Sequence, residues 1–471
     1  MNNRYKYLLK NIGLLTISNF SSKILILLLV PLYTNVLTTE EFGIFDLVIS
    51  TIQLLVPILT LNIVDAVMRF SMDIKASKQD VVSIGLLYIT RSCFLVVICL
   101  LISHYTNLIP NIYDYELLIV VYYVFYVLNQ FFIQLAKGLE RVKDMAVSGI
   151  LGTIVMLLFN IIFLLVVKKG LIGFFWANAF AQMISALYLA LQLKFWKYLK
   201  VNLDQRLKKE MLIYSLPLAL TTIGWWINNA SDKYIVTFMC GIGASGLLSV
   251  AYKIPGIIMT FQNIFIQAWL ISAIREYGEE GDNKFYSESF VYLNILMCLV
   301  CSLLIILLKP IANILYAKDF YAAWQFVPFL LVSSVLNASS GFVGPILSAA
   351  KNSKAMAKAA IYGAATNVIV SLILVHIMDV QGAVVATLIS SYVIYIVRKK
   401  AVGKLLDSPL YSRVMISWLF LCIQTVLAIY VTEIIFQFVV MISLLFLYKT
   451  PIINISIELK CRFLNNLNNY I

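Results

Sequence analysis

Residues 224–255 read GWWINNASDKYIVTFMCGIGASGLLSVAYKIP and are apolar enough to lie in a lipid bilayer. Three charged residues nevertheless fall inside this stretch: Asp232, Lys233 and Lys253. A charge at the bilayer centre costs about 3 kcal/mol on insertion scales, so such residues usually face a protein cavity, water or one another. The stretch therefore predicts a polar, positively charged interior within the membrane.

The composition of the whole chain agrees with a membrane protein. Its 471 residues are 62% hydrophobic, and only 13% carry charge, which is about half the usual share in soluble domains. The mean hydropathy is +0.91. The net charge of +13 is explained by basic cytoplasmic loops, and no aromatic-interleaved basic domain points to nucleic acid. We predict an all-α polytopic membrane protein that binds no nucleic acid.

Apolar runs of spanning length recur along the whole chain. A spanning helix needs about 20 mostly apolar residues, which predicts about fourteen spans. The last two are joined so tightly that a shorter hairpin is an alternative. The expected spans are 12–37, 43–68, 80–104, 113–136, 145–167, 170–195, 211–238, 243–273, 287–308, 322–350, 355–378, 381–400, 411–431 and 433–449.

Lysine and arginine are distributed unequally between the two sides of these spans. Most of the 36 fall in loops and tails on the side of the N-terminus. The opposite loops hold only Lys168, Lys169, Lys309 and Lys318. Cytoplasmic loops accumulate basic residues, so we expect both termini in the cytoplasm. The first apolar segment is expected to be a retained helix, not a signal peptide.

The largest basic cluster, KFWKYLKVNLDQRLKK at 194–209, follows the sixth span. It fits an inter-domain linker, or simply a juxtamembrane loop that meets anionic lipid. A faint repeat accompanies it: Lys23 falls opposite Lys233 and, after a gap of seven residues, Gly43 falls opposite Gly246. Two related halves are common in transporters.

Enzymatic motifs are absent from the sequence. It contains no phosphate-binding P-loop, no H-E-x-x-H and no G-x-S-x-G. The longest outer loop, YTNLIPNIYD at 105–114, is too short for a catalytic domain. Cys298 and Cys301 lie in an apolar run and fit small hydrophobes better than a metal or redox site. We expect no catalytic residue, no metal site and no enzyme.

The charges inside the predicted spans define the candidate site. Asp65 and Arg69 share a helix face at i, i+4 spacing. Cations outnumber acids in the interior, which suits an anionic cargo such as a phosphate, a pyrophosphate or a carboxylated sugar. For Lys253, an alternative is that the side chain snorkels to the interface. The predicted cations are Lys23, Arg69, Arg91, Lys233 and Lys253, and the predicted acids are Asp65 and Asp232.

Other polar and aromatic residues have two interpretations each. Trp225 and Trp226 fit stacking on sugar rings, or plain packing and an interfacial belt. Asn228 and Asn229 fit hydrogen bonds to sugar hydroxyls, or to a neighbouring helix. A further basic cluster fits a rim at the cytoplasmic mouth or an ordinary basic loop; it comprises Lys351, Lys354 and Lys358.

Several motifs taken together resemble a known family. They are NFSSKILILLLVPLYTNVLTTEEFGIFDL near the start, DAVMRFSMD, NASDKYIV, AYKIPGI and GPILSAAKNSK. In this order the chain resembles the Wzx-type polysaccharide flippases of the multidrug/oligosaccharidyl-lipid/polysaccharide (MOP) exporter superfamily. The resemblance covers essentially the whole length.

The resemblance implies a fold with two six-helix bundles around a central cationic cavity, alternating access, and two additional C-terminal helices. Carried onto this chain, it gives four parts. They are an N-terminal bundle at 1–193, a basic linker at 194–210, a C-terminal bundle at 211–404, and two extra helices with a tail at 405–471.

The resemblance also implies a function. Such proteins move undecaprenyl-diphosphate-linked oligosaccharides from the cytoplasmic to the outer face of the bacterial plasma membrane. There the units are polymerised into O-antigen, capsule or exopolysaccharide, with a polymerase and a chain-length regulator as partners. The interior cations would hold the diphosphate, and Asp65 and Asp232 would pair with them or couple transport to protons or sodium ions. No other cofactor is implied.

Other functions stay open at this point. A lipid II flippase shares the fold and the charge logic. A small-cation drug antiporter of the same superfamily is disfavoured, because like charges repel in a low-dielectric cavity. A membrane-embedded polymerase is disfavoured by the short outer loops, and a non-transporting scaffold by buried charges that would have no purpose.

Overall fold

The computed structural model describes residues 23, 25–73, 75–106, 114–275, 282–350, 352–406, 410–431 and 433–449. Within these ranges every regular element is a helix, so the predicted all-α class is confirmed. Ten helices are long and apolar enough to cross a membrane, and one bent pair forms a further candidate. Two shorter apolar helices cover Leu25–Val36 and Ile434–Leu447. Each of the expected spans contains a helix.

The chain groups into two compact units. The first comprises the described residues up to Val250 together with Leu315–Phe320, and the second comprises Ala251–Ile314 and the described residues from Tyr321 onward. The four-part division expected from the sequence is not tested by this grouping and stays a prediction.

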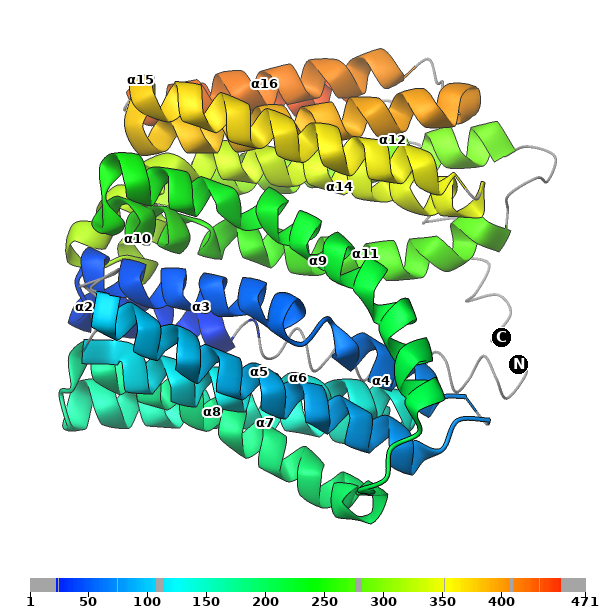
Figure 1. Ribbon diagram of the computed structural model, residues 1–471. Coiled ribbons are helices and arrows are strands. Elements are labelled where there is room, and N and C mark those ends of the chain that lie inside the picture. Colours follow the sequence, from blue (N-terminus) through cyan, green and yellow to red (C-terminus); the bar gives the residue numbers. More distant parts are fainter. Residues whose placement is uncertain are drawn as a thin grey trace, which may run out of the picture. The chain divides into compact units, whose positions relative to one another are not determined.

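The first unit consists of helices, and Figure 1 labels the α-helices among them. They are α2 (Val30–Val36), α3 (Thr39–Leu59), α4 (Ile63–Ser71), α5 (Lys78–Thr106), α6 (Glu116–Gly138), α7 (Val142–Asn160) continued by the π-helix η2 (Ile161–Val166), α8 (Gly170–Leu193), the 3-10 helix η3 (Phe195–Tyr198), α9 (Gln205–Cys240) and α10 (Ile242–Ala251). Its core is apolar and includes the fully buried Val127, Phe131 and Phe175.

The second predicted span is broken, where the sequence suggested a continuous helix. A capping box begins α3: Thr38 Oγ1 accepts from the Glu41 amide, and the Glu41 carboxylate accepts from the Thr38 amide. Pro57 lies in the last turn, and Leu61 and Asn62 then adopt left-handed backbone conformations. This break separates α3 from α4, which carries Asp65 and Arg69.

The basic linker between α8 and α9 is fastened to the start of α5. Lys200 Nζ lies 3.0 and 2.9 Å from the two carboxylate oxygens of Asp80, which is 3% exposed. The same carboxylate accepts a bond from the Asp204 amide at 3.1 Å. Asp204 in turn caps α9, so the ion pair fixes where α9 begins.

The second unit contains the remaining helices. They are α11 (Lys253–Arg275), α12 (Asp282–Ile306), α13 (Leu308–Leu315), the 3-10 helix η4 (Lys318–Phe326), α14 (Val327–Ala349), α15 (Ser353–Val402), the 3-10 helix η5 (Gly403–Leu406), α16 (Tyr411–Tyr430) and α17 (Ile434–Leu447). The short Leu315–Phe320 segment at the α13–η4 junction belongs to the first unit.

Two of the expected spans lie within α15. The helix runs for 50 residues, but Asp379 has the non-helical angles φ 50° and ψ −139°. This residue separates the expected spans 355–378 and 381–400. The bend between α10 and α11 is 43°. Its cause is Pro255, because a proline ring clashes with the carbonyl four residues earlier, here that of Ala251 at the end of α10.

The two C-terminal helices pack into the core of the second unit. Tyr448, directly after α17, is fully buried and donates to Ser417 Oγ of α16 at 2.8 Å. Cys298 Sγ of α12 lies 3.4 Å from the same Ser417 oxygen. Trp418 Nε1 donates to Asn294 Oδ1 on α12 at 3.2 Å. Cys298 therefore contributes to helix packing.

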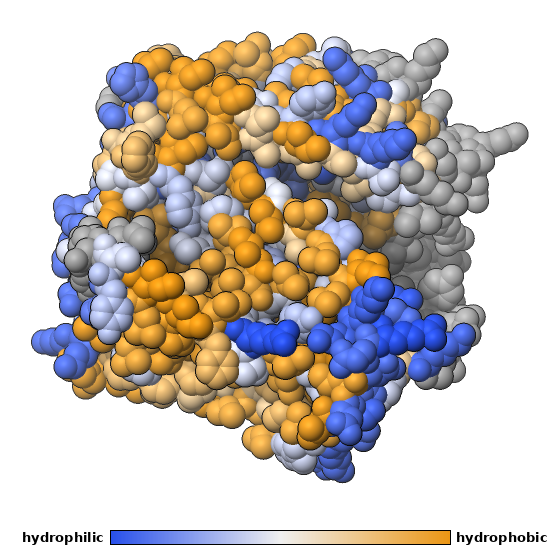
Figure 2. All heavy atoms as spheres, in the orientation of Figure 1, coloured by the Kyte–Doolittle hydropathy of each residue, from blue (hydrophilic) through white to orange (hydrophobic). Residues whose placement is uncertain are grey.

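The surface agrees with a position in the membrane. Over the first-unit helices, Figure 2 shows apolar side chains along the helix bodies and hydrophilic side chains gathered mainly at helix ends. Exposed apolar residues are numerous on α5 and α9, and include Phe94, Leu101 and Leu220. An apolar surface of this extent is stable in contact with lipid, so these helices are expected to face the membrane.

Candidate functional site: a buried ion pair between α3 and α9

An ion pair lies inside the apolar helices of the first unit. Lys233 Nζ of α9 lies 2.7 Å from Asp46 Oδ2 of α3. The two side chains are only 16% and 17% exposed. Ser249 Oγ of α10 donates to the same carboxylate oxygen at 2.6 Å. Three helices thus converge on Asp46, and an unpaired charge at this depth would be costly.

Close helix packing brings these groups together. A side chain at Gly43 of α3 would collide with the Ile242 carbonyl oxygen, and one at Gly246 of α10 would collide with the Thr39 carbonyl oxygen. Glycine at both positions lets the two backbones approach, as small residues do in membrane helix pairs. Ser249 and Asp46 lie about one turn beyond this contact.

The contact is reciprocal. Under the alignment that pairs Gly43 with Gly246, Thr39 corresponds to Ile242 and Asp46 to Ser249. Gly43 approaches Ile242, and Gly246 approaches Thr39. A two-fold relation between equivalent surfaces produces this pattern. The two glycines that the faint repeat aligns therefore lie in one helix contact, and Asp46 and Ser249, which the same alignment pairs, lie beside it.

Near the ion pair, aromatic side chains of α9 form hydrogen bonds to α3. Trp226 Nε1 donates to the Ser50 carbonyl at 2.8 Å. The Tyr234 hydroxyl lies 2.7 Å from Thr51 Oγ1, and its ring centroid is 5.3 Å from that of Trp226. Trp226 thus serves helix packing, one of its two interpretations. Sugar contact by either tryptophan stays a prediction.

The remaining residues of the stretch differ in exposure. Trp225 is 67% exposed, and Asn229 Nδ2 donates to its carbonyl at 2.7 Å. Asn228 is half-buried, and its Oδ1 atom has no hydrogen-bond partner in the described part of the chain. Asp232 is 4% exposed, and its Oδ1 accepts from the Lys233 amide at 2.9 Å.

The other predicted cations of the first unit do not join Lys233. Lys23, Arg69 and Arg91 are exposed, and none forms an ion pair with a described residue. Asp65 and Arg69, which share a helix face, form no ion pair with each other. Asp65 instead accepts hydrogen bonds from Asn62 Nδ2 and Gln134 Nε2, both at 2.8 Å. The break at Leu61 and Asn62 places Asn62 within reach of this carboxylate.

Two groups of predicted residues lie elsewhere. Lys253 begins α11, is half-buried and belongs to the second unit. Lys354 and Lys358 are exposed at the start of α15, whereas Lys351 lies outside the described residues. Their roles in binding or as a basic rim stay predictions.

Asp46 was missed by the sequence reasoning. It was read as part of the GIFDL motif and was not counted among the interior acids. Two signals could have found it: its place inside the 43–68 apolar run and its alignment with Ser249, three residues after the paired glycines. Asp46 changes the charge balance of the site, because the side chain of Lys233, which is only 16% exposed, has an acidic partner.

The sequence comparison identifies the family. The profile of the polysaccharide biosynthesis protein family matches residues 8–271, which include α3, α9 and α10. The chain belongs to the polysaccharide biosynthesis protein family. No curated protein matches the chain in sequence.

Solved structures of several transporters share the fold of this chain. A lipid II flippase, MurJ, in an inward closed conformation aligns with a TM-score of 0.68 and 14% identity, over 94% of this chain and 99% of that one. An inward-facing multidrug resistance MATE transporter aligns with a TM-score of 0.63 and 14% identity, over 89% and 100%. A MOP transporter from Pyrococcus furiosus aligns at 0.59 and 16% identity, over 85% and 97%.

Proposed function

We propose that this protein is a flippase for lipid-linked oligosaccharides, and not an enzyme. It would move undecaprenyl-diphosphate-linked repeat units from the cytoplasmic to the outer face of the bacterial plasma membrane. Membership of the polysaccharide biosynthesis family and the flippase-like fold support this proposal. The observation that carries it is the Lys233–Asp46 pair, which keeps a cation available inside apolar helices.

In the proposed cycle, the substrate diphosphate displaces Asp46 from Lys233. A diphosphate offers more charge and more acceptor oxygens than one carboxylate, so it competes well for the ammonium group. Displaced Asp46 keeps its bond from Ser249 and loses its contact with the Lys233 ammonium group. Uptake of a proton or a sodium ion by Asp46 would compensate this charge and couple transport to an ion gradient.

On the outer face the cycle would reverse. Loss of the coupling ion from Asp46 restores the carboxylate, which reclaims Lys233 and releases the diphosphate. The Lys233–Asp46 pair would thus stabilise the empty transporter and, by re-forming, would keep Lys233 from retaining the diphosphate. The released unit would then pass to a polymerase and a chain-length regulator that build O-antigen, capsule or exopolysaccharide.

A panel of cargoes in proteoliposomes tests the proposal. We expect wild-type protein to move an undecaprenyl-diphosphate-linked oligosaccharide to the far leaflet, where an impermeant glycosidase or a periodate label detects it. Lipid II transport of equal or greater rate would favour a peptidoglycan role instead. Efflux of a cationic dye without lipid transport would favour a drug antiporter, and formation of longer glycans would show a polymerase.

A further inference from the structure

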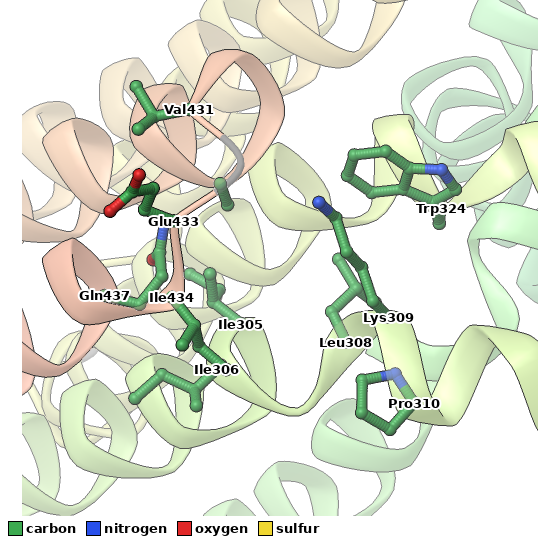
Figure 3. A pocket seen from close by; sticks show the side chains of 11 residues that line it. Ile305, Ile306, Leu308, Lys309, Pro310, Trp324, Val431, Glu433, Ile434 and Gln437 are labelled. Atoms are coloured by element: carbon green, nitrogen blue, oxygen red, sulfur yellow. The ribbon is translucent and has the colours of Figure 1, made fainter.

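A second polar site lies in the second unit, at the ends of α12 and α16. Figure 3 shows a pocket between the α12–α13 junction, η4 and the α16–α17 turn. Its volume is about 140 Å³. Substrate pockets usually measure about 300–1,000 Å³, so this one accommodates a headgroup but no lipid-linked oligosaccharide.

Opposite charges line this pocket without pairing to each other. Lys309 Nζ lies 4.9 Å from the Trp324 ring centroid, a cation–π contact that holds the amine in place. Glu433 lies across the pocket and is exposed, and its carboxylate is turned away from Lys309 in this view (Figure 3). In the described part of the chain neither residue has an ion-pair partner.

A buried amide completes the polar part of the site. Gln437 lines the same pocket, is 5% exposed, and has no hydrogen-bond partner for Oε1 or Nε2 within the described residues. It follows Glu433 by four residues on α17, so both side chains lie on one helix face. A buried amide left without hydrogen bonds is unfavourable, so the site calls for a ligand that both donates and accepts.

The rest of the pocket is apolar and adjoins a lipid-facing surface. Ile305, Ile306 and Ile434 contribute walls. Beside them, Ile435 and Phe436 of α17 are 64% and 47% exposed. The pocket therefore lies where spans end and where the headgroups and upper acyl chains of a bilayer are found.

We propose that this pocket binds the headgroup of a zwitterionic phospholipid of the phosphoethanolamine type. The phosphate takes the Lys309 ammonium and the Gln437 Nε2 donor. The headgroup ammonium takes the Gln437 Oε1 acceptor and the Glu433 carboxylate at the rim. The acyl chains leave along the isoleucine walls into lipid.

Other headgroups fit these groups less well. A phosphatidylglycerol headgroup carries a net negative charge and has no cation for Glu433. A phosphatidylcholine headgroup carries a cation whose methyl groups leave no N–H to donate. A sugar has hydroxyls for Gln437 but makes no use of the two opposite charges.

Lipid binding to the purified full-length protein tests the site independently of transport. Phosphatidylethanolamine, phosphatidylglycerol or phosphatidylcholine is added to delipidated protein in detergent, and retained lipid is counted by native mass spectrometry alongside the melting temperature. We expect wild type to bind phosphatidylethanolamine at least about tenfold more tightly than the other two. Equal binding of all three, or protection by free monosaccharides instead, overturns the proposal.

Three variants and a control locate the binding. Lys309→Met should lose phosphatidylethanolamine binding by about tenfold or more, and Glu433→Gln should lose only the preference over phosphatidylglycerol. Gln437→Leu should melt at the same or a higher temperature without lipid and gain nothing from phosphatidylethanolamine. Lys169→Met, an exposed cation of the first unit, should match wild type. Unchanged phosphatidylethanolamine binding in Lys309→Met, or an unchanged preference over phosphatidylglycerol in Glu433→Gln, contradicts the site.

Discussion

At the scale of single residues, Asp46 and Lys233 are the pair on which the site depends. Removing one partner leaves the other charge in an apolar setting, which typically destabilises by about 3–5 kcal/mol. We expect Asp46→Asn to lower the melting temperature of the purified protein clearly, whereas Glu40→Gln, an exposed acid at the start of the same helix, should not.

The double variant distinguishes the interaction between the two side chains from the separate effect of each substitution on stability. Asp46→Asn combined with Lys233→Met removes both charges, so its cost should be smaller than the sum of the two single changes. Strict additivity of the three melting shifts would show that the two side chains do not interact, and would contradict the ion pair.

Little of this residue-scale arrangement followed from the sequence. Lys233 and Asp232 stood out because a charge in an apolar run is costly wherever the run folds. The partner of Lys233 lies 187 positions earlier, and side-chain pairing over such a separation depends on helix packing. The same holds for Asp65: it shares a helix face with Arg69, but it bonds to Asn62, because the backbone conformation at Leu61 and Asn62 brings Asn62 to it.

At the scale of helices, the glycine contact between α3 and α10 sets how closely the site is assembled. Gly246→Ala would push a methyl group into the Thr39 carbonyl, so we expect a lower melting temperature and weaker coupling between Asp46 and Ser249. Gly224→Ala on α9 is the matched control, because no other atom lies within 4 Å of the position that the added Cβ would take. There alanine should stabilise by about 0.5–1 kcal/mol. Equal effects at both positions would contradict the close approach.

The fastening of the basic linker gives a second prediction at this scale. Asp80 is buried and binds both Lys200 and the Asp204 amide, so Asp80→Asn should loosen residues 194–209 and speed tryptic cleavage there. Glu210→Gln removes the ion pair between Arg206 and Glu210, whose side chains are 88% and 49% exposed. This change should leave the cleavage rate unchanged. A cleavage rate in Asp80→Asn equal to wild type would argue that the linker is held by other contacts.

Element positions were largely predictable, because an apolar run of spanning length becomes a helix in lipid whatever its neighbours. The separation of spans near Asp379 was anticipated from hydropathy alone. The break before α4 and the packing of α16 and α17 into the second unit were not, because they depend on backbone turns and on buried bonds such as Tyr448 to Ser417.

At the scale of the whole molecule, the all-helical fold and the MOP-like architecture followed from span count and motif resemblance, and both are confirmed at the level of fold. The transport proposed above requires a charge arrangement that changes during a cycle. The Lys233–Asp46 pair is suited to this, since cargo and coupling ion would compete for its two members.

The most direct test of this account is the rate at which Lys233→Met moves an undecaprenyl-diphosphate-linked oligosaccharide across proteoliposomes, at a matched amount of folded protein. We predict a loss of about 100-fold or more, because a cation that is needed by the diphosphate is gone. Lys233→Arg should retain part of the rate, and Lys169→Met all of it. A wild-type rate in a folded Lys233→Met protein would contradict the central claim that Lys233 carries the cargo.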